Sequence, residues 1–347
     1  MRVLLGMSGG VDSTYAALKL KEEGYHVEGA VLVMHEYTET EAAVSSAESV
    51  GIPIHKIDCT EAFESCVVSD FISEYLSGRT PNPCIICNSE VKFRVLLDYA
   101  LENGFDMIAT GHYAKIVERT FDGRVRYGIA RAEDGKKDQT YVLWRLSQDI
   151  LSHLCFPLSH IKKDEVRELS RKNELSAADR GDSQEICFIP SGDYAGFIEN
   201  RTQPSKPGYF ISNEGKILGE HKGIIHYTVG QRKGLGIAMG QRIFVTKINP
   251  KDNTVTLSFD DSVSQIVNIS GVIFSGIPDM VKGEIKQLKV KLRYLAPPVE
   301  CLLEYKGQGQ ATVKLFEPVR AVTPGQSAVF YDGEILAAGG YIDSEHL

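Results

Sequence analysis

The first 18 residues, MRVLLGMSGGVDSTYAAL (residues 1–18), predict a strand, a loop and a helix in that order. The apolar run at residues 3–5 favours a strand, and the residues after position 13 have the apolar spacing of a helix. Gly9 and Gly10 lack Cβ atoms, so the loop can adopt positive φ angles and let another group approach its backbone. Because unpaired N–H groups at a helix N-terminus attract anions, the sequence predicts a phosphate-binding loop over residues 8–13.

Two common phosphate-binding motifs do not fit this loop. No Gly-Lys-Ser or Gly-Lys-Thr follows the glycines, as a Walker loop requires. The Gly-x-Gly-x-x-Gly spacing of dinucleotide-binding loops is also absent. The alternative interpretation is a tight turn in an α/β sheet, which would account for a lone Gly-Gly pair.

The composition limits the class of protein. With 347 residues, the chain is long enough for two or three domains. No apolar run approaches the roughly 18 residues needed to cross a bilayer, and the N-terminus leads into a strand without a signal sequence, so we expect a cytoplasmic protein with no membrane partner. The net charge of −8 provides no global attraction for nucleic acid, so RNA binding would need local basic patches.

The chain alternates between strands and helices up to about residue 110. Apolar runs at residues 3–7, 26–34, 52–59 and 105–111 predict strands, and the segments around 14–23, 39–50, 61–76 and 89–103 predict helices. This alternation predicts a doubly wound parallel sheet with its ligand sites at the carboxyl ends of the strands. The dipeptide Asp122-Gly123 predicts a hairpin after the fourth strand.

The pattern changes near Pro204-Ser205-Lys206-Pro207-Gly208. Beyond this segment, short alternating runs separated by Asn, Asp and Gly turns predict strands and almost no helix. We therefore expect an α/β domain at residues 1–203, a small β-rich linking domain at residues 204–268 and a C-terminal β-barrel at residues 269–347.

Eight segments in this order resemble the bacterial tRNA-specific 2-thiouridylases. They are GMSGGVDS (6–13), GRTPNPCIICNSEVKF (78–93), ATGHYA (109–114), KKDQTYVLWRL (136–146), DSQEICFI (182–189), HYTVGQRKGLGI (226–237), LRY (292–294) and TPGQSAVFYDGE (323–334). The first segment alone would indicate only the superfamily of pyrophosphate-releasing ATP enzymes. The resemblance implies an ATP pyrophosphatase-type fold and ATP-dependent 2-thiolation of the wobble uridine of tRNA. ATP would adenylate the C2 carbonyl oxygen, and sulfur delivered as a protein persulfide would replace that oxygen.

The resemblance also implies a nucleotide site made of the glycine-rich loop, Leu32 and Gly111. The loop residues are Gly6, Met7, Ser8, Gly9, Gly10, Val11, Asp12 and Ser13. The carboxylate of Asp12 suits a Mg²⁺ ion bound to phosphates, and it is also able to cap the helix that follows. Without the resemblance, Leu32 would be interpreted as a core residue.

The sulfur chemistry requires thiols, and the chain contains seven cysteines. An odd number favours reactive or metal-binding thiols over a disulfide framework. We expect Asn88 to cap a helix, so that Cys87 lies at a helix N-terminus where the dipole lowers the pKa of a thiol. The resemblance implies that Cys87 is catalytic, that Cys187 carries the persulfide, and that a Cys87–Cys187 disulfide closes after sulfur transfer. Cys84 is considered below, and we interpret the remaining four cysteines as small hydrophobic residues: Cys59, Cys66, Cys155 and Cys301.

Cys84 has a separate interpretation, because many members of the family carry another residue there, often aspartate. Cys84 and Cys87, together with Cys187, are able to hold three irons of a [4Fe–4S] cluster and leave the fourth iron open to bind sulfide. Cys84 and Cys87 also have the spacing of a redox pair. Persulfide chemistry without a metal and a cluster-based mechanism both stay open on the sequence.

The resemblance implies two macromolecular partners, tRNA and a persulfide sulfur-donor protein. The tRNA-binding residues that it implies are His112, Lys137, Asp138, Gln139, Arg293, Tyr294 and Gln326. A guanidinium beside an aromatic ring, as in Arg293-Tyr294, suits phosphate contact and base stacking. Two other function classes remain on the sequence: an ATP pyrophosphatase that acts on a small molecule, and an RNA-binding protein without enzymatic activity.

Overall fold

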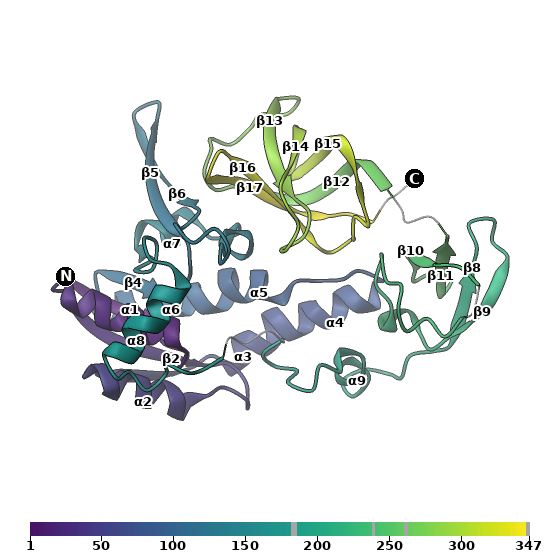
Figure 1. The fold of residues 1–347 in the computed structure, drawn as a ribbon. Helices are drawn as coiled ribbons and strands as arrows, with labels where there is room; N and C mark the ends of the chain where they lie inside the picture. The colour runs from purple at the N-terminus through teal and green to yellow at the C-terminus, as the bar shows by residue number, and fades with distance from the viewer. Residues whose placement is uncertain (182–185, 238–239, 260–262, 345–347) are drawn as a thin grey trace.

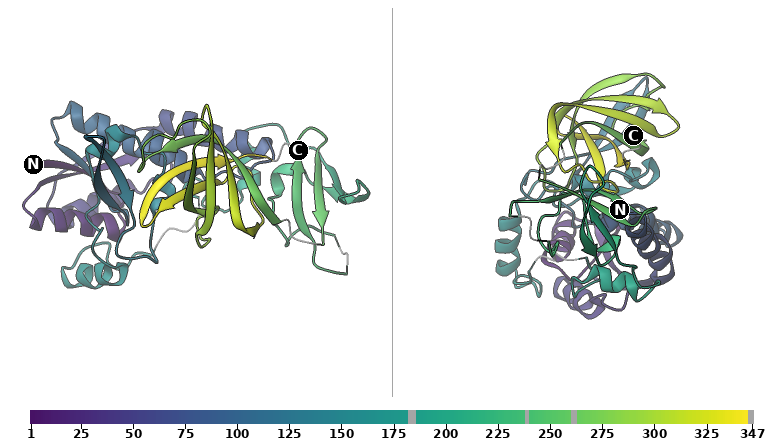
Figure 2. Two further views of the ribbon diagram at one scale, coloured as in Figure 1. Left: turned by 90° about the horizontal axis from the view of Figure 1, so that it is seen from above. Right: turned by 90° about the vertical axis from the view of Figure 1, so that its right-hand side faces the viewer.

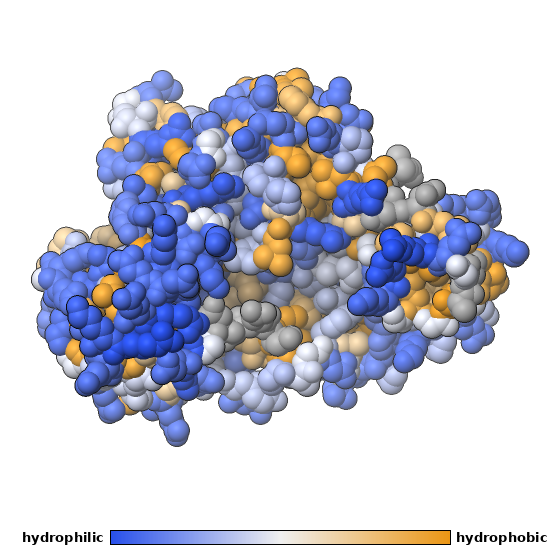
Figure 3. Space-filling view, in the orientation of Figure 1, coloured by the Kyte–Doolittle hydropathy of each residue, from blue (hydrophilic) through white to orange (hydrophobic). Residues whose placement is uncertain are grey.

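A computed structural model describes residues 1–181, 186–237, 240–259 and 263–344. Figure 1 shows an α/β part that contains the N-terminus, a barrel above it, and a small β-rich part at the right. Seen from above, these three parts follow one another along the molecule, with the barrel in the middle (Figure 2). On the face shown in Figure 3, hydrophilic side chains dominate the α/β part, whereas apolar side chains gather on the barrel.

A five-stranded parallel sheet in the order β3-β2-β1-β4-β7 forms the centre of the α/β part. Its strands are β1 (Arg2–Gly6), β2 (His26–Val33), β3 (Ile54–Asp58), β4 (Met107–Thr110) and β7 (Leu154–Cys155). On one face α1 (Val11–Glu22), α2 (Thr40–Val50) and α8 (Lys163–Lys172) pack against Val3, Leu5 and Val31. On the other face α6 (Phe93–Glu102) packs against Leu4 and Ile108. Helices cover both faces, so the predicted doubly wound parallel sheet is confirmed.

Two long helices of this part contain a π-helical turn, a feature often found at functional sites. The first runs through α3 (Thr60–Phe63), η1 (Glu64–Val68) and α4 (Ser69–Leu76), as the sequence predicts for residues 61–76. The second runs through α5 (Pro83–Ile86), η2 (Cys87–Lys92) and α6. It begins earlier than the predicted residue 89, and its π turn starts at Cys87.

The hairpin predicted at Asp122-Gly123 is confirmed, and it joins β5 (Lys115–Phe121) to β6 (Arg124–Ala130). β6 pairs with β17 (Ile335–Ile342), which belongs to the barrel. After the hairpin come a 3-10 turn, η3 (Thr140–Leu143), and the short helix α7 (Gln148–Ser152). The buried residues of this segment belong to a core cluster that also contains Val329, Tyr331 and Leu336. The core is therefore continuous from the α/β sheet into the barrel.

The β-rich middle part follows α9 (Tyr194–Glu199). Its four-stranded sheet has the order β10-β11-β8-β9, made of β8 (Gly208–Ile211), β9 (Ile217–His221), β10 (Phe244–Asn249) and β11 (Thr254–Ser258). A 3-10 turn, η4 (Ile224–His226), lies between β9 and β10. Phe210, Val245 and Val255 are buried at the centre of its own small core.

The C-terminal part is a closed barrel of six strands, as predicted. The strand order β12-β15-β14-β13-β16-β17 is closed by pairing of β12 with β17. The strands not yet given are β12 (Val263–Phe274), β13 (Ile285–Lys291), β14 (Val299–Gly307), β15 (Gln310–Arg320) and β16 (Ser327–Asp332). The expected boundary between residues 268 and 269 falls within β12. Within the described residues, none of the helices is both long and apolar enough to cross a membrane.

Candidate active site

The glycine-rich loop connects β1 to α1, as the sequence predicts. Gly9 has a φ of +76°, and a Cβ at this position would lie 2.7 Å from Ala42, so a larger residue would not fit. Gly10 is the N-cap of α1 and makes no side-chain capping bond. Ser13 donates from Oγ to the carbonyl oxygen of Gly10 at 3.0 Å and accepts from the N–H of Ser8 at 3.3 Å. The loop thus presents a helix N-terminus whose N-cap residue has no side chain to cap it, which is a geometry that favours an anion.

Asp12 does not cap this helix, because it lies inside the first turn. Its two carboxylate oxygens have different protein partners. Tyr113 donates from its hydroxyl to Oδ1 at 2.8 Å, and Lys163 donates from Nζ to Oδ2 at 2.6 Å. The oxygens suit Mg²⁺ chemically, but a metal ion would have to take the place of one of these partners. Neither Tyr113 nor Lys163 could be linked to Asp12 from the sequence, since they lie 101 and 151 residues away.

Three expected nucleotide-site segments meet at the carboxyl edge of the sheet. Gly6 at the end of β1 is paired with Ala30 on β2 and with Thr110 on β4. A Cβ on Gly111 would lie 2.8 Å from the backbone nitrogen of Ser13, so β4 ends directly against the start of α1. Leu32, near the end of β2, is buried in a core cluster that also contains Cys87. The topology therefore brings the loop, Leu32 and Gly111 to the same edge of the sheet.

His112 lies beside this edge and is packed against aromatic rings. Its Nδ1 is 2.8 Å from Thr110 Oγ1, and its ring centroid is 5.5 Å from that of Phe93 and 6.2 Å from that of Phe156. Burial lowers the pKa of His112 to about 3. The imidazole is therefore neutral at pH 7, and its implied contact with tRNA stays a prediction.

The thiol-bearing helix begins differently from the sequence prediction. The N-cap is Asn82, whose Oδ1 accepts from the N–H of Cys84 at 3.2 Å, and Pro83 occupies the first helical position, where its lack of an N–H costs nothing. Asn88 is 2% exposed and donates to the carbonyl oxygen of Val142 at 3.0 Å. The prediction that Asn88 caps a helix and that Cys87 lies at its N-terminus was therefore wrong.

Cys87 is buried, and its pKa is shifted in the direction opposite to the expected one. Burial raises the pKa of its thiol to about 12. Its Sγ lies 3.8 Å from the Sδ of Met34, just beyond the end of β2. The thiol thus lies at the same edge of the sheet as the glycine-rich loop, but it is shielded from water and protonated at neutral pH.

Cys84 and Cys187 are exposed and interact with Cys87 and with each other electrostatically. Although Cys187 is exposed as a residue, partial burial of its thiol is the main cause that raises the pKa, and the neighbouring Cys84 raises it further. Within the described residues, no group of three or more His, Cys, Asp or Glu side chains is arranged to hold a metal ion. The three thiols interact with one another, but their arrangement in this structure does not fit the ligand set of a [4Fe–4S] cluster. The rest of the Cys187 motif, residues 182–185, lies outside the described residues.

The remaining cysteines have the structural character expected of them. Cys59 and Cys301 are buried, and Cys66 and Cys155 are half-buried. Burial raises the pKa of Cys59 to about 11 and that of Cys155 and Cys301 to about 12. The thiols of Cys59, Cys155 and Cys301 are therefore protonated at neutral pH and are not poised as nucleophiles.

The segment that contains Lys137, Asp138 and Gln139 is bonded to the residues around Asp12. Gln139 accepts from the backbone N–H of Tyr113 through Oε1 at 2.8 Å and donates its own N–H to the carbonyl oxygen of Tyr113 at 3.1 Å. Asp138 accepts from the N–H of Thr140 at 3.0 Å through Oδ1, and its side chain is nearly buried. Lys137 is exposed, so the segment lies at the surface, and the bonds of Asp138 and Gln139 hold it in place.

The residues that follow fix the barrel to the α/β part, a role that the sequence analysis missed. Tyr141 donates from its hydroxyl to the carbonyl oxygen of Ser327 at 2.8 Å, and Trp144 donates from Nε1 to Ser327 Oγ at 3.1 Å. Both rings are fully buried. In the sequence, only the large aromatic side chains of Tyr141 and Trp144 indicate such a packing role.

Arg293 joins the barrel to the middle part by hydrogen bonds. Arg293 Nη2 donates to the carbonyl oxygen of Ala321 at 2.6 Å, to Thr323 Oγ1 at 2.5 Å and to the carbonyl oxygen of Val229 in the middle part at 3.3 Å. Burial is the main cause that raises the pKa of Tyr294; the nearby Asp138 and Cys84 raise it further, whereas Lys137 lowers it. The barrel loop that carries Arg293 and Tyr294 therefore adjoins the thiol-bearing segment.

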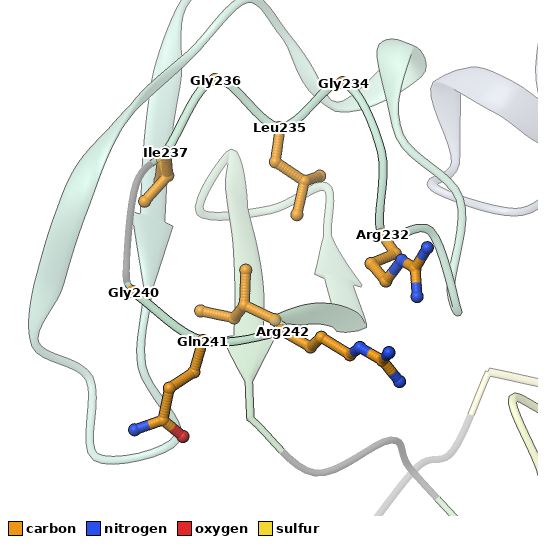
Figure 4. A pocket seen from close by; sticks show the side chains of 9 residues that line it. Arg232, Gly234, Leu235, Gly236, Ile237, Gly240, Gln241 and Arg242 are labelled. Atoms are coloured by element: carbon orange, nitrogen blue, oxygen red, sulfur yellow. The ribbon is translucent and has the colours of Figure 1, made fainter.

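One hollow lies near the thiols, and another lies in the middle part. One, of about 420 Å³, is lined by Met34, His35, Phe63, Phe188 and other residues, so it adjoins Cys87 through Met34 and Cys187 through Phe188. The other, of about 810 Å³, lies in the middle part and is lined by Arg232, by residues 234–237 and by residues 240–243. The guanidinium groups of Arg232 and Arg242 point to the same side of this second hollow (Figure 4).

Comparisons with known proteins cover nearly the whole chain. The family profile described as "tRNA methyl transferase HUP domain" matches residues 1–191, that of the "tRNA methyl transferase PRC-barrel domain" matches residues 195–258, and that of the "Aminomethyltransferase beta-barrel domain" matches residues 275–342. The chain is similar to a protein named tRNA-specific 2-thiouridylase MnmA from Clostridium acetobutylicum, with 43% identity over 98% of this chain and 99% of that protein. A protein of the same name from Acetivibrio thermocellus is also 43% identical over the same shares.

The similarity to solved structures is weaker. A 4-thiouridine synthetase–RNA complex with bound ATP has a TM-score of 0.37 and 17% sequence identity, and the match covers 58% of this chain and 50% of that chain. Such a similarity is too low to support an argument about the residues of this site.

Proposed function

The chain belongs to the tRNA-specific 2-thiouridylase family, and from this premise we propose that it is an ATP-dependent tRNA-uridine 2-sulfurtransferase. The observation that carries this proposal is the position of Cys87, which contacts Met34 just past the end of β2, while the glycine-rich loop follows the neighbouring strand β1. A phosphate-binding loop and a thiol at one edge of a sheet suit activation followed by sulfur transfer.

In the first step, the C2 carbonyl oxygen of the wobble uridine attacks the α-phosphorus of ATP. The bond from this phosphorus to the bridging oxygen breaks, pyrophosphate leaves, and an adenylated uridine forms. The N–H groups at the start of α1 and the hydroxyls of Ser8 and Ser13 would bind the β- and γ-phosphates, with Leu32 against the adenine and Gly111 allowing a close approach. Asp12 would hold a Mg²⁺ ion, whose charge would offset that of the phosphates.

In the second step, the terminal sulfur of a Cys187 persulfide attacks C2 of the activated base, and AMP leaves with the former carbonyl oxygen. The Cys87 thiolate then attacks the Sγ of Cys187, which releases the 2-thiocarbonyl and forms a Cys87–Cys187 disulfide. A two-electron thiol reductant must reopen this disulfide. Because burial keeps the Cys87 thiol protonated at pH 7, the reaction requires a change in its surroundings that lowers its pKa.

The cluster-based alternative places the donated sulfur on an iron instead of on Cys187. It would use Cys84, Cys87 and Cys187 as ligands of a [4Fe–4S] cluster. The present arrangement of the thiols does not favour it, since Cys87 is buried against Met34. Replacement of Cys84 separates the two models.

The proposed partners are tRNA and a protein that donates persulfide sulfur to Cys187. His112, Lys137, Asp138, Gln139, Arg293, Tyr294 and Gln326 are the proposed tRNA-binding residues. The proximity of Tyr294 to Cys84 and Lys137 supports a tRNA path between the barrel and the thiol-bearing helix. The division of the chain at residues 203/204 stays part of this proposal, whereas a boundary at 268/269 would divide strand β12.

The decisive experiment incubates the full chain with unmodified tRNA, ATP, Mg²⁺ and a persulfide donor under reducing conditions. We expect 2-thiouridine to appear in digested tRNA by mass spectrometry, and AMP to form only when tRNA is present. Asp12→Ala should abolish thiolation while tRNA binding persists, because Asp12 lies in the glycine-rich loop and is not one of the proposed tRNA-binding residues. AMP formation at full rate without tRNA would favour a small-molecule synthetase, and absence of AMP would favour a non-enzymatic RNA-binding protein.

A further inference from the structure

Lys163 is a buried cation beside the glycine-rich loop. It is the first residue of α8, it is 5% exposed, and its Nζ lies 2.6 Å from Asp12 Oδ2. Asp12 is the only acidic residue of the loop segment 6–13. A chain segment far from the loop in sequence therefore delivers a positive charge to the loop's single carboxylate.

The position of Lys163 is unfavourable for a residue that serves only the fold. A cation at the first position of a helix opposes the partial positive charge of the helix N-terminus. Removing an ammonium group from water is also costly unless an anion faces it. Asp134 offsets part of the charge at the helix N-terminus, because its Oδ2 accepts from the backbone N–H of Lys163 at 2.9 Å. The side-chain charge itself is matched by Asp12.

The preceding residue offers an internal comparison. Lys162 is the N-cap of α8, is exposed and makes no side-chain capping bond. Two consecutive lysines thus differ in environment: one extends into solvent, and the other is buried against the loop. A general need for positive charge at this helix would be met by the exposed lysine alone.

A bound polyphosphate would change the electrostatics of this region. Its oxygens would lie beside Asp12, and the helix N-terminus supplies only about half an elementary charge to balance them. Asp12 and the phosphates would then repel each other unless cations lay beside them, and one Mg²⁺ ion does not balance all the charges of a polyphosphate and a carboxylate. A lysine has three donors on a flexible stem, so it is able to turn from a carboxylate oxygen to a nearby phosphate oxygen.

We propose that Lys163 is a phosphate-binding residue that changes its partner: it neutralises Asp12 when the loop is empty and contacts a phosphate oxygen of the nucleotide when the loop is filled. The exchange frees one oxygen of Asp12. This inference rests on the proposed use of ATP and assigns a further residue to that site. It also gives a role to the bond that Lys163 makes to Oδ2, whereas Tyr113 holds Oδ1.

The first test measures binding of Mg²⁺-pyrophosphate to the full chain by calorimetry. We expect Lys163→Met to weaken the affinity about tenfold or more, since a charge-assisted hydrogen bond is lost. The matched control, Lys162→Met, should change it less than about twofold. Both variants should bind tRNA as the wild type does. Equal pyrophosphate affinity of Lys163→Met and wild type would overturn the inference.

The second test removes the carboxylate while keeping its shape. In metal-free buffer, Asp12→Asn should bind pyrophosphate more tightly than the wild type, because Lys163 no longer has to leave a carboxylate. The double variant with Lys163→Met should lose most of this gain. The double variant lacks both the carboxylate and the ammonium group, so no unpaired charge is buried, and it tests the inference even if Lys163→Met alone does not fold. Retention of the whole gain in the double variant contradicts a phosphate contact.

The two proposals fail in different ways. A wild-type protein that binds neither pyrophosphate nor ATP contradicts the proposed function. A wild-type protein that binds both, together with a Lys163→Met variant that binds them equally well, contradicts only the role of Lys163.

Discussion

Gln326 in the barrel donates from Nε2 to the carbonyl oxygen of Thr80 at 2.8 Å, and this bond joins the barrel to the segment that enters the thiol-bearing helix. Thr80 returns a bond from its N–H to the carbonyl oxygen of Pro324 at 2.9 Å. Its hydroxyl also donates to Thr228 Oγ1 in the middle part at 3.2 Å. The three parts of the protein therefore meet at Thr80, shortly before Cys84.

Replacing Gln326 tests this junction. Gln326→Ala removes one hydrogen bond and should lower the free energy of unfolding by about 1 kcal/mol. We expect thiolation to fall as well, because the segment that leads to Cys84 loses its barrel contact, while ATP affinity is unchanged. Thiolation assays and urea unfolding check both effects. The control is Gln287→Ala on the exposed surface of β13, and thiolation by Gln326→Ala at the control's rate would contradict the prediction.

Replacing Arg293 distinguishes its structural bonds from a contact with tRNA. Arg293→Ala should lower the melting temperature, because Ala321 and Thr323 lose a donor, and should weaken tRNA binding without changing ATP affinity. If Arg293 also contacts a phosphate, the salt dependence of tRNA affinity should decrease by about one unit of slope. A lower melting temperature with unchanged tRNA affinity at every salt concentration would assign Arg293 to structure alone. Arg320→Ala, an exposed arginine at the end of β15, is the control.

The parts of the fold that local patterns encode could be predicted from the sequence. The strand–loop–helix at residues 2–22, the Asp122-Gly123 hairpin and the closed barrel follow from periodicity and turn residues. The two-residue strand β7 is too short to produce a pattern. The start of the thiol-bearing helix was missed because Asn82-Pro83 and Asn88 both resemble helix starts, and only packing decides between them.

The candidate site could be predicted only where its chemistry lies in one segment. The glycine-rich loop is such a segment, whereas the partners of Asp12 come from elements more than 100 residues away. The pKa of Cys87 was predicted in the wrong direction, since burial against Met34 is a tertiary effect that outweighs a helix dipole. Arg293 and Gln326 look like surface residues in the sequence because nothing local reveals their bonds across domain junctions.

His112 predicts a specific pH dependence of stability. Burial lowers the pKa of His112 to about 3, below the ordinary value of 6.5. Between these values the unfolded chain binds a proton that the folded chain does not. The free energy of unfolding should therefore fall as pH drops below about 6.5, with a limiting slope of about 1.4 kcal/mol per pH unit from this residue. Urea unfolding at pH 7 and pH 5 should show a smaller loss in His112→Gln than in wild type, whereas His160→Gln, at an exposed position, should match wild type.

The burial of Cys87 predicts slow alkylation in the free protein. Iodoacetamide should modify exposed Cys84 and Cys187 first, while Cys87 reacts slowly and its rate rises about tenfold per pH unit, because its pKa is about 12. Mass spectrometry of the full chain after timed quenching measures each site, with buried Cys301 as the internal reference. Rapid modification of Cys87 at pH 7, at the rate of Cys84, would falsify the shielded state. Addition of tRNA and ATP should accelerate the modification of Cys87 if sulfur transfer requires its thiolate.

The final prediction separates the two sulfur mechanisms. Cys187→Ser and Cys87→Ser should each stop thiolation, because a hydroxyl can neither carry a persulfide nor form a disulfide. Neither change should block tRNA-dependent AMP formation, since activation uses only ATP and the carbonyl oxygen. Cys84→Ser should keep substantial activity if Cys84 lies outside the reacting pair.

Under the cluster mechanism, Cys84 is one of three iron ligands, so thiolation and bound iron should fall together in Cys84→Ser. The measurement is iron content and thiolation of protein prepared without oxygen, with Cys66→Ser at a half-buried structural position as the control. We expect an active, iron-free Cys84→Ser protein, because the proposed roles of Cys87 and Cys187 do not need Cys84. Loss of both activity and iron in this variant alone would establish the cluster mechanism instead.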